Sequence, residues 1–390
     1  FALATICIAL FVPKHEGDPA RTFRAELRVF RRPQVWFALA TGAIGFGGMR
    51  FANPTDTERN ADLVRHAHAR GIDYFDTAPS YCDDRSEGIF GAALGSLPRG
   101  SFFVSTKSAQ RNGARLRAEL ERSLERLRLD RIDFFHVWCL MSPEDWRARL
   151  AGGAVDAALR AQQDGLIRHL VCSSHMAGED LAAVLATEAF VGVTLGYNAM
   201  NFPFRAAAVR AASERGLGVV AMNPLAGGLI PRNPDRFAFL AQPSDPSVVT
   251  GALRFLVVDP SVSVALVGFT SEREVDEAVA AADLAEAASA ERAAALREHV
   301  ERSFDEVCTG CGYCLPCPAD IPIPRFLDVF NLRLLGGDDA ELQARFRWHW
   351  AVNQDLVSAC TDCGDCEARC TQHLPIRERL RALPVPRRVP

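Results

Sequence analysis

Eight cysteines gather near the end of the chain, and their spacing suits an inorganic cluster better than a disulfide framework. The chain has 12 cysteines, and the other four stand singly. The eight form two sets: Cys308, Cys311, Cys314, Cys317 and Cys360, Cys363, Cys366, Cys370. Three thiolates spaced this closely wrap one corner of a cubane cluster, and a remote fourth completes it. A secreted disulfide scaffold would spread its cysteines through a small domain, so thiolate ligands in a reducing, cytoplasmic compartment fit better.

The spacing also predicts how many clusters there are and which cysteines share each one. The second set has the C-x2-C-x2-C-x3-C pattern, and Pro318 follows the first set. By analogy with two-cluster ferredoxins, one 4Fe-4S cluster is expected on Cys308, Cys311, Cys314 and Cys370, the other on Cys360, Cys363, Cys366 and Cys317. Structural zinc is the alternative, but zinc sites typically take two cysteines from each of two separated pairs.

An acid, a phenol and an amine form a second candidate site, much earlier in the chain. Asp76 ends the β-rich run IDYFDTA, Tyr81 follows in the next loop, and Lys107 ends the run FFVSTKS. A free tyrosine has a pKa near 10 and is a poor acid at neutral pH. We expect the ammonium of Lys107 to lower the pKa of Tyr81, while Asp76 holds the ammonium in place. Such a trio can give a proton to a carbonyl oxygen as hydride reaches the carbon.

Regular alternation of strands and helices indicates how these side chains meet. Short apolar runs begin near Ile44, Ile72, Phe102, Ile132, Ile167, Phe190, Leu217 and Val262. Stretches with helical periodicity lie between them, such as 115–129, where leucines recur at spacings of four, four and three. Eight such units predict a (β/α)8 barrel, in which strand carboxyl ends converge on one mouth. An open doubly wound sheet is the alternative, but the early GFGG does not fit its GxGxxG turn.

From residue 42 to 282 the sequence resembles the aldo/keto reductases. The motifs that carry the resemblance are DTAPSY (76–81), STK (105–107), the IDFF strand from Ile132, SSH (173–175), YN (197–198) and NPLAGG (223–228). The resemblance implies an NAD(P)H-dependent carbonyl reductase with Tyr81 as acid/base, tuned by Lys107 and Asp76. It also implies cofactor contacts. Ser173 and Ser174 would reach the nicotinamide amide, and the diphosphate would lie along Asn223, Leu225, Gly227 and Gly228.

The sequence departs from the family at its fourth catalytic residue, a histidine. The corresponding position is Trp138, whereas this chain has a histidine two residues earlier, at His136. Both residues share one strand face, with His136 about 6–7 Å deeper. His136 takes the catalytic place if the strand end bulges or shifts. In the alternative, it is a structural histidine inside the barrel and Trp138 forms a substrate wall.

The cofactor positions depart from the family as well. The glutamine that bonds the nicotinamide amide corresponds to Thr194, and the aromatic residue that stacks on the ring corresponds to Met222. The cations that hold the adenosine 2′-phosphate correspond to Gly268 and Glu274, and the adenine-binding asparagine to Ala278. Charge-assisted bonds to the 2′-phosphate distinguish NADP from NAD, and neither position carries a cation to form them. The sequence therefore leaves the choice between the two cofactors open.

The cysteine-rich end matches a branch of this family that carries a ferredoxin-type tail. CTGCGYCLPCP and the later CxxCGxCExxC are its pattern. We therefore predict an N-terminal extension of uncertain structure at 1–41, a barrel at 42–300 and a small, mostly helical two-cluster domain at 301–390. Residues 345–350, RFRWHW, are basic and aromatic, and we interpret them as helix packing rather than as a nucleic-acid site.

Two functional classes fit the sequence. The first is an oxidoreductase that reduces or oxidises a small carbonyl or alcohol substrate, with clusters relaying electrons to or from a partner protein. The second is an electron-transfer or binding protein on a degenerate barrel. Binding of NADH or NADPH would favour the first. A formal charge of −4 argues against a nucleic-acid partner, and no apolar run is long enough to span a membrane.

Overall fold

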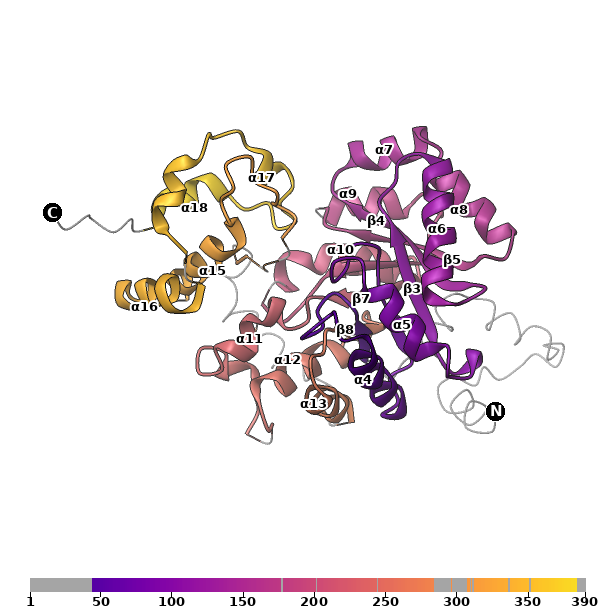
Figure 1. The fold of residues 1–390 in the computed structure, drawn as a ribbon, viewed down its shortest axis with the longest axis horizontal. Helices are drawn as coiled ribbons and strands as arrows, with labels where there is room; N and C mark the ends of the chain where they lie inside the picture. The colour runs from indigo at the N-terminus through magenta and orange to yellow at the C-terminus, as the bar shows by residue number, and fades with distance from the viewer. Residues whose placement is uncertain are drawn as a thin grey trace, which may run out of the picture.

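Eight parallel strands close into a barrel. The computed structural model describes residues 44–176, 178–200, 202–243, 245–283, 296, 307–308, 310, 312–335, 337–350 and 352–383, so the predicted extension at 1–41 lies outside the described residues. The strands are β1 (Ile44–Gly47), β2 (Tyr74–Asp76), β3 (Phe103–Ser108), β4 (Ile132–Leu140), β5 (Ile167–Ser174), β6 (Gly192–Gly196), β7 (Gly218–Met222) and β8 (Val264–Val267). Each pairs with the next and β1 pairs with β8, which confirms the barrel (Figure 1). The doubly wound alternative is wrong.

Helices surround the barrel and bury their apolar faces against it. They are α4 (Thr57–Ala69), α5 (Ser86–Leu94), α6 (Gly113–Leu127), α7 (Pro143–Ala151), α8 (Ala154–Gln163), α9 (Gly178–Leu185), α10 (Phe202–Glu214), α11 (Leu229–Arg232), α12 (Val248–Val257) and α13 (Glu272–Asp283), with 3-10 turns η2 (Arg99–Ser101), η3 (Ala226–Gly228) and η4 (Ala238–Leu240). Helix α6 is the one predicted from leucine periodicity. Its leucines at 116, 120, 124 and 127 are all buried, and Asn112 caps its first turn.

Strand alternation fills the barrel interior and orients the candidate site. Tyr74, Phe134, Val171, Val220, Val264 and Leu266 form an apolar cluster separate from the one under the helices. Gly45 leaves room for it, because a Cβ there would lie 2.8 Å from Val264 Cγ1. Since side chains alternate along a strand, the residues two positions after Tyr74 and Phe134 also face inward, nearer the carboxyl ends. These residues are Asp76 and His136.

The described residues from 307 to 383 form a separate helical unit beside the barrel (Figure 1), called the C-terminal unit below. It contains α15 (Ile323–Leu334), α16 (Asp339–Ala344), the π-helix η5 (Arg345–Trp350), η6 (Gln354–Ala359), α17 (Asp365–Ala368) and α18 (Ile376–Ala382). Within η5, Phe346 is buried against Phe326, and Arg345 and Trp350 both donate to Asp328, at 2.8 and 2.9 Å. The side chains of Arg345, Phe346 and Trp350 therefore pack within the unit, in line with the predicted helix packing.

The C-terminal unit rests on loops at the carboxyl ends of the strands. Arg236, which follows α11, donates to Leu332 O at 3.4 Å and forms an ion pair with Glu341 at 3.2 Å. Arg50, which follows β1, donates to Gly310 O at 3.3 Å. These contacts place the cysteine-rich segments beside the barrel mouth. Within the described part of the chain, no helix has the length and apolar character needed to cross a membrane.

Candidate functional site

Asp76 and Lys107 form a buried ion pair where β2 and β3 end. Lys107 Nζ donates to Asp76 Oδ1 at 2.5 Å and to the carbonyl oxygen of Thr77 at 2.7 Å. Ser105, which lies opposite Asp76 in the sheet register, donates its hydroxyl proton to Asp76 Oδ2. Both charged residues are only 2% exposed. The carboxylate is thus held by two residues of β3 that lie two positions apart, and it fixes the ammonium at the barrel mouth.

Tyr81 lies directly above this pair. Lys107 Nζ is 5.1 Å from the centroid of the Tyr81 ring. The loop that carries the ring is tightly wound, since Ser80, Cys82, Asp83 and Asp84 all adopt positive φ. Asp84 accepts from the Ser80 backbone and pairs with Arg126 at 2.7 Å, which anchors the loop to α6. The structure therefore brings together the three residues that the sequence selected.

The expected lowering of the Tyr81 pKa is wrong for this structure. Burial of the phenol raises the pKa of Tyr81 well above its usual value near 10, and the nearby charges of Tyr313 and Asp76 raise it further. Burial also lowers the pKa of Lys107, although Asp76 opposes that shift. Because Lys107 is already paired with Asp76, its ammonium does little to stabilise a phenolate. The phenol stays protonated at neutral pH.

A bulge at the end of β4 separates His136 from Trp138. The register of β4 against β5 shifts between Val137 and Leu140, and Cys139 adopts a positive φ of 59°. Trp138 consequently packs edge-on against Tyr81, with ring centroids 5.7 Å apart. His136 lies opposite Lys107 in the register, 1% exposed, with Nε2 3.9 Å from Asp76 Oδ2. Burial and then the Lys107 charge lower the pKa of His136 well below its usual value, so the ring is neutral.

The carboxyl-terminal parts of β5 and β6 carry three hydroxyl side chains, those of Ser173, Ser174 and Thr194. Ser173 Oγ accepts from the Cys139 backbone at 2.9 Å, and Ser174 Oγ donates to Leu140 O at 3.2 Å, so both hydroxyls brace the β4 bulge. Thr194 pairs with Ser173 in the sheet register and is buried. Its Oγ1 has no hydrogen-bond partner among the described residues. An orphaned buried hydroxyl at this level fits a bound group that carries hydrogen-bonding atoms.

The NPLAGG segment after β7 forms a tight cradle. Asn223, Gly227 and Gly228 have φ of 57°, 67° and 88°, a region that favours glycine at the last two positions. Two guanidinium groups lie against this cradle. Arg232 donates to Gly228 O at 2.9 Å and Arg50 to Gly227 O at 3.5 Å. The backbone and its two cations suit an anionic group such as a diphosphate.

Sequence reasoning missed Arg50 and Arg232. It looked for the phosphate cations near Gly268 and Glu274, where the family places them. In the structure, the Glu274 carboxylate accepts a hydrogen bond from the Thr270 backbone and is not a cation. Gly268 lies close to the loop after β1, since a Cβ placed on it would be 3.8 Å from the Cβ of Arg50. The guanidinium of Arg50 itself bonds Gly227 O and Gly310 O. The basic residue directly after GFGGM was a possible signal, but its significance depends on the barrel closing β1 onto β8.

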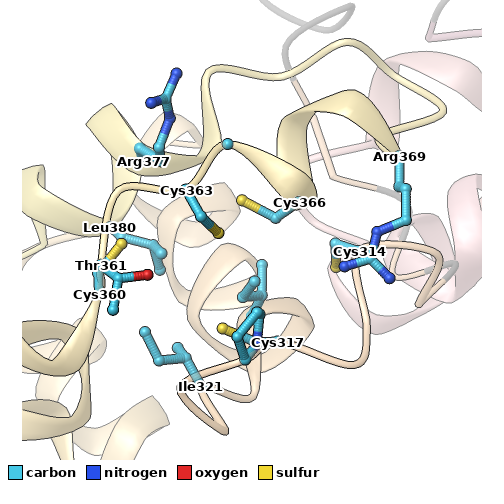
Figure 2. Close-up of a pocket in the computed structure, with 13 residues that line it drawn as sticks. Cys314, Cys317, Ile321, Cys360, Thr361, Cys363, Cys366, Arg369, Arg377 and Leu380 are labelled. Carbon is cyan, nitrogen blue, oxygen red and sulfur yellow. The ribbon is translucent and has the colours of Figure 1, made fainter.

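Four thiols surround one cavity in the C-terminal unit. The sulfurs of Cys317, Cys360, Cys363 and Cys366 point into a common space, with Cys314 at its edge (Figure 2). Arg369 and Arg377 also line this cavity. Arg369 is held in place by donation to Leu315 O and Pro316 O at 3.0 and 2.9 Å. Arg377 turns its guanidinium away from the sulfurs (Figure 2) and pairs with Glu367 and Asp362, at 2.6 and 3.5 Å, so its charge is largely neutralised there.

A second cavity brings the two cysteine segments together again. Cys308, Cys314 and Cys370 line it, and Cys311, the fourth predicted ligand, lies outside the described residues. Asn331 fixes the Cys308 backbone from α15, accepting from its N–H at 2.8 Å and donating to its carbonyl oxygen at 2.7 Å. Backbone N–H groups of Gly310 and Leu374 point at the sulfurs of Cys308 and Cys370, both at 3.4 Å. Such donors tune iron–sulfur clusters.

The donor sets fit clusters better than single metal ions. Among the described residues, no group of three or more histidine, cysteine, aspartate or glutamate side chains converges closely enough to hold one ion. A cubane keeps its thiolates farther apart than a single zinc does, and it uses thiolates alone. The grouping of the described cysteines around the two cavities follows the crossed pattern expected from two-cluster ferredoxins.

Comparison with known proteins identifies both parts of the chain. The model of the aldo/keto reductase family matches residues 43–301. The chain belongs to the aldo/keto reductase family. A 4Fe-4S dicluster domain matches residues 305–374, so this oxidoreductase is of the branch that carries a C-terminal iron–sulfur domain.

Relatives and solved structures agree with the family. The chain is 27% identical to L-galactose dehydrogenase of Arabidopsis thaliana over 273 residues, which cover 62% of this chain and 85% of that one. It is 28% identical to D-threo-aldose 1-dehydrogenase of a Pseudomonas species over 247 residues, which cover 53% of this chain and 74% of that one. The fold resembles that of an aldo-keto reductase of Klebsiella pneumoniae in complex with NADPH, with a TM-score of 0.56 and 22% identity. The superposition covers 66% of this chain and 90% of that one.

Proposed function

We propose that this aldo/keto reductase interconverts a small carbonyl compound and its alcohol, with NADP(H) as hydride carrier and Tyr81 as acid/base. The observation that carries the proposal is the buried Lys107–Asp76 pair directly beneath the Tyr81 ring. When bound, the nicotinamide supplies or accepts hydride. The protonated phenol donates its proton to the carbonyl oxygen during reduction, and the phenolate takes it back during oxidation.

The other candidate residues orient the reactants. Lys107 and Asp76 fix the polar floor of the mouth, and neutral His136 lies beside Asp76 as a further polar group in the barrel. Ser173 and Thr194 lie next to one another where the nicotinamide amide is expected, and the unpartnered Thr194 hydroxyl supports that position. Asn223, Leu225, Gly227 and Gly228 would cradle the diphosphate.

The cations beside the cradle favour NADP over NAD. Arg232 and Arg50 both donate to its carbonyl oxygens, and the Cβ of Arg50 lies close to Gly268, so its flexible side chain is within reach of the place where the family holds the 2′-phosphate. A guanidinium recognises a phosphate with charge-assisted hydrogen bonds, and NAD has no phosphate at that position.

Two 4Fe-4S clusters would serve as a relay to a one-electron carrier protein. Cys308, Cys311, Cys314 and Cys370 would hold one cluster, and Cys317, Cys360, Cys363 and Cys366 the other. Each cluster passes single electrons, whereas hydride carries two. Coupling of the relay to the barrel therefore requires a substrate that tolerates a radical or an additional cofactor such as a flavin.

One observation favours a second function, electron transfer or binding without hydride chemistry. Trp138 stands where the family has its catalytic histidine, and its ring packs edge-on against Tyr81. On this alternative the barrel is a docking scaffold for the iron–sulfur domain, and neither nicotinamide nucleotide binds.

A titration separates the two functions. Protein purified without oxygen is analysed for iron and sulfide, and about eight irons per chain are expected for two clusters. NADPH and NADH are then titrated while the quenching of their fluorescence is followed. Tighter binding of NADPH supports the proposed reductase, whereas absence of binding by both nucleotides supports the alternative. Stoichiometric zinc without sulfide would contradict the cluster assignment.

A further inference from the structure

A buried carboxylate lies on the outer face of β3, on the opposite side of the strand from Lys107. Glu87, near the start of α5, is 1% exposed, and its Oε1 accepts from the Thr106 hydroxyl at 2.6 Å. Because side chains alternate along a strand, Thr106 points toward the helices while Lys107 points into the barrel. Burial of a carboxylate is costly unless charged partners and hydrogen bonds compensate for the lost water, and the reaction proposed above does not use Glu87.

Arg126 on α6 connects this carboxylate to the loop that carries Tyr81. Its Nη1 donates to Glu87 Oε2 at 3.3 Å, and both terminal nitrogens donate to the two oxygens of Asp84 at 2.7 Å. Such a bidentate pair fixes direction as well as distance. Asp84 Oδ1 also accepts at 3.2 Å from the backbone N–H of Ser80, the residue before Tyr81. A continuous chain of polar contacts therefore runs from β3 to the catalytic loop along the outside of the barrel.

The backbone of this loop is strained. Four of its residues, none of them glycine, have φ between 54° and 70°. Left-handed backbone is unfavourable for residues with a Cβ, and it persists only where surrounding contacts impose it. The Tyr81 ring is thus held over the ion pair at the barrel mouth by contacts that the loop makes, rather than by the conformational preference of the loop itself.

We propose that Glu87 and Arg126 are positioning residues for Tyr81, the acid/base of the proposed function. With Thr106 and Asp84 they form a unit that is called the Arg126 clamp below. The clamp ties the loop to β3 and thereby holds the phenol at the distance that proton transfer requires. This inference rests on the proposed function, because the loss from a misplaced acid is a loss of rate.

Three variants test the clamp in the full-length protein, purified without oxygen. Asp84→Asn keeps an oxygen acceptor and suits a positive φ, but it removes the charge that pairs with the guanidinium. Glu87→Gln keeps an acceptor for Thr106 and removes the charge at the buried end. Asp83→Asn is the matched control, since Asp83 is an exposed aspartate of the same loop with a φ of 54° and lies outside the clamp.

Steady-state reduction of propionaldehyde by NADPH is the first measurement. Asp84→Asn and Glu87→Gln are each expected to lower kcat about tenfold, and to change the aldehyde KM and the Kd of NADPH less than about twofold. The control should keep all three values. When Tyr81→Phe is already present, Asp84→Asn should change the remaining rate less than about twofold, because the clamp acts through the phenol. A full tenfold loss in that background, or an unchanged kcat in both clamp variants, would overturn the inference.

Hydrogen exchange tests the loop without catalysis. The backbone N–H of Ser86 donates to the Tyr81 carbonyl oxygen at 3.2 Å, so opening of the loop exposes this amide. Its exchange, followed by mass spectrometry, is expected to be about fivefold faster in the two clamp variants and unchanged in the control. Equal exchange in all four proteins would contradict the clamp. If the unaltered protein reduced no aldehyde, the proposed function would fail, and exchange at Ser86 would still decide whether the clamp holds the loop.

Discussion

The ammonium of Lys107 lies 5.1 Å from the centroid of the Tyr81 ring, but it forms its ion pair with Asp76, whose Oδ1 is 2.5 Å away. Proximity alone would suggest an acidic phenol. Because the carboxylate neutralises the ammonium and the surrounding atoms exclude water, burial dominates and the pKa of Tyr81 rises. The free enzyme therefore presents a phenol, and this sets the direction in which the reaction responds to pH.

Carbonyl reduction and alcohol oxidation are expected to have opposite pH dependences. Reduction needs the protonated phenol, so its kcat/KM should stay flat from about pH 6 to 9, since the pKa of Tyr81 lies well above 10. Oxidation needs the phenolate, so its kcat/KM should rise about tenfold per pH unit over the same range. Steady-state rates in both directions check this. A reduction rate that falls tenfold between pH 7 and 8 would show that the phenol ionises near neutrality.

The barrel could be predicted from sequence because its signals are local. Leucine spacing predicted α6, and the apolar runs located all eight strands to within about two residues of their observed starts. Asp76, Tyr81 and Lys107 could be selected because strand carboxyl ends meet at one mouth. The β4 bulge could be named only as one of two alternatives, since it depends on Ser173 and Ser174 holding the backbone of a neighbouring strand.

The interface between the barrel and the C-terminal unit was also beyond sequence reasoning. Arg50 and Tyr313 are 263 positions apart, and nothing in their local sequence indicates that both reach the same mouth. The effect of burial on the pKa of Tyr81 was equally hard to predict from sequence. The identity of Lys107 suggested a lower pKa for Tyr81, but the surrounding atoms that reverse the shift come from several strands and loops.

Removal of the cradle cations is expected to weaken NADPH more than NADH. Arg50→Ala should raise the Kd of NADPH about tenfold and change that of NADH less than threefold, because charge-assisted bonds to a phosphate are lost. Arg59→Ala, which removes an exposed arginine of α4, is the control. Fluorescence titration measures the affinity of each nucleotide for the unaltered protein and for both variants. Equal losses of affinity for NADPH and NADH would show that Arg50 contacts only the diphosphate. Unchanged affinities would show that Arg50 does not contact the nucleotide.

Asn331 is expected to determine whether one of the two clusters assembles. Asn331→Leu removes both hydrogen bonds to the Cys308 backbone, so the segment no longer presents its thiolate. Iron content should fall from about eight to about four per chain, because the other cysteine cavity is unaffected. Gln343→Leu is the matched control, since that amide bonds Gln354 rather than a cysteine segment. Full iron content in the Asn331 variant would contradict this role.

His169 is expected to make the barrel less stable at mildly acidic pH. Burial lowers its pKa from 6.5 to about 4, and the charges of Arg168 and Arg131 add to the effect. Between these values the unfolded chain binds a proton that the folded chain does not, so the free energy of unfolding decreases as pH falls from 6.5 to 4. The decrease from this ring should approach about 1 kcal/mol per pH unit.

Denaturant unfolding of the unaltered protein and of His169→Phe at several pH values measures that contribution. The phenylalanine keeps a flat ring against Phe134, which lies 5.4 Å from the histidine ring, but cannot bind a proton. Its unfolding free energy should therefore depend less on pH in this window. The same slope for both proteins would assign the acid sensitivity to other groups.

Deuterium transfer from NADPH tests hydride chemistry at Tyr81 most directly. The full chain, purified without oxygen and loaded with iron, is incubated with NADPH deuterated at C4 and a small aldehyde, and the alcohol is analysed by mass spectrometry. The account predicts a deuterated alcohol, formed 10²- to 10⁴-fold more slowly by Tyr81→Phe although that variant still binds NADPH. An alcohol without deuterium, or the same rate in the Tyr81 variant, would contradict it.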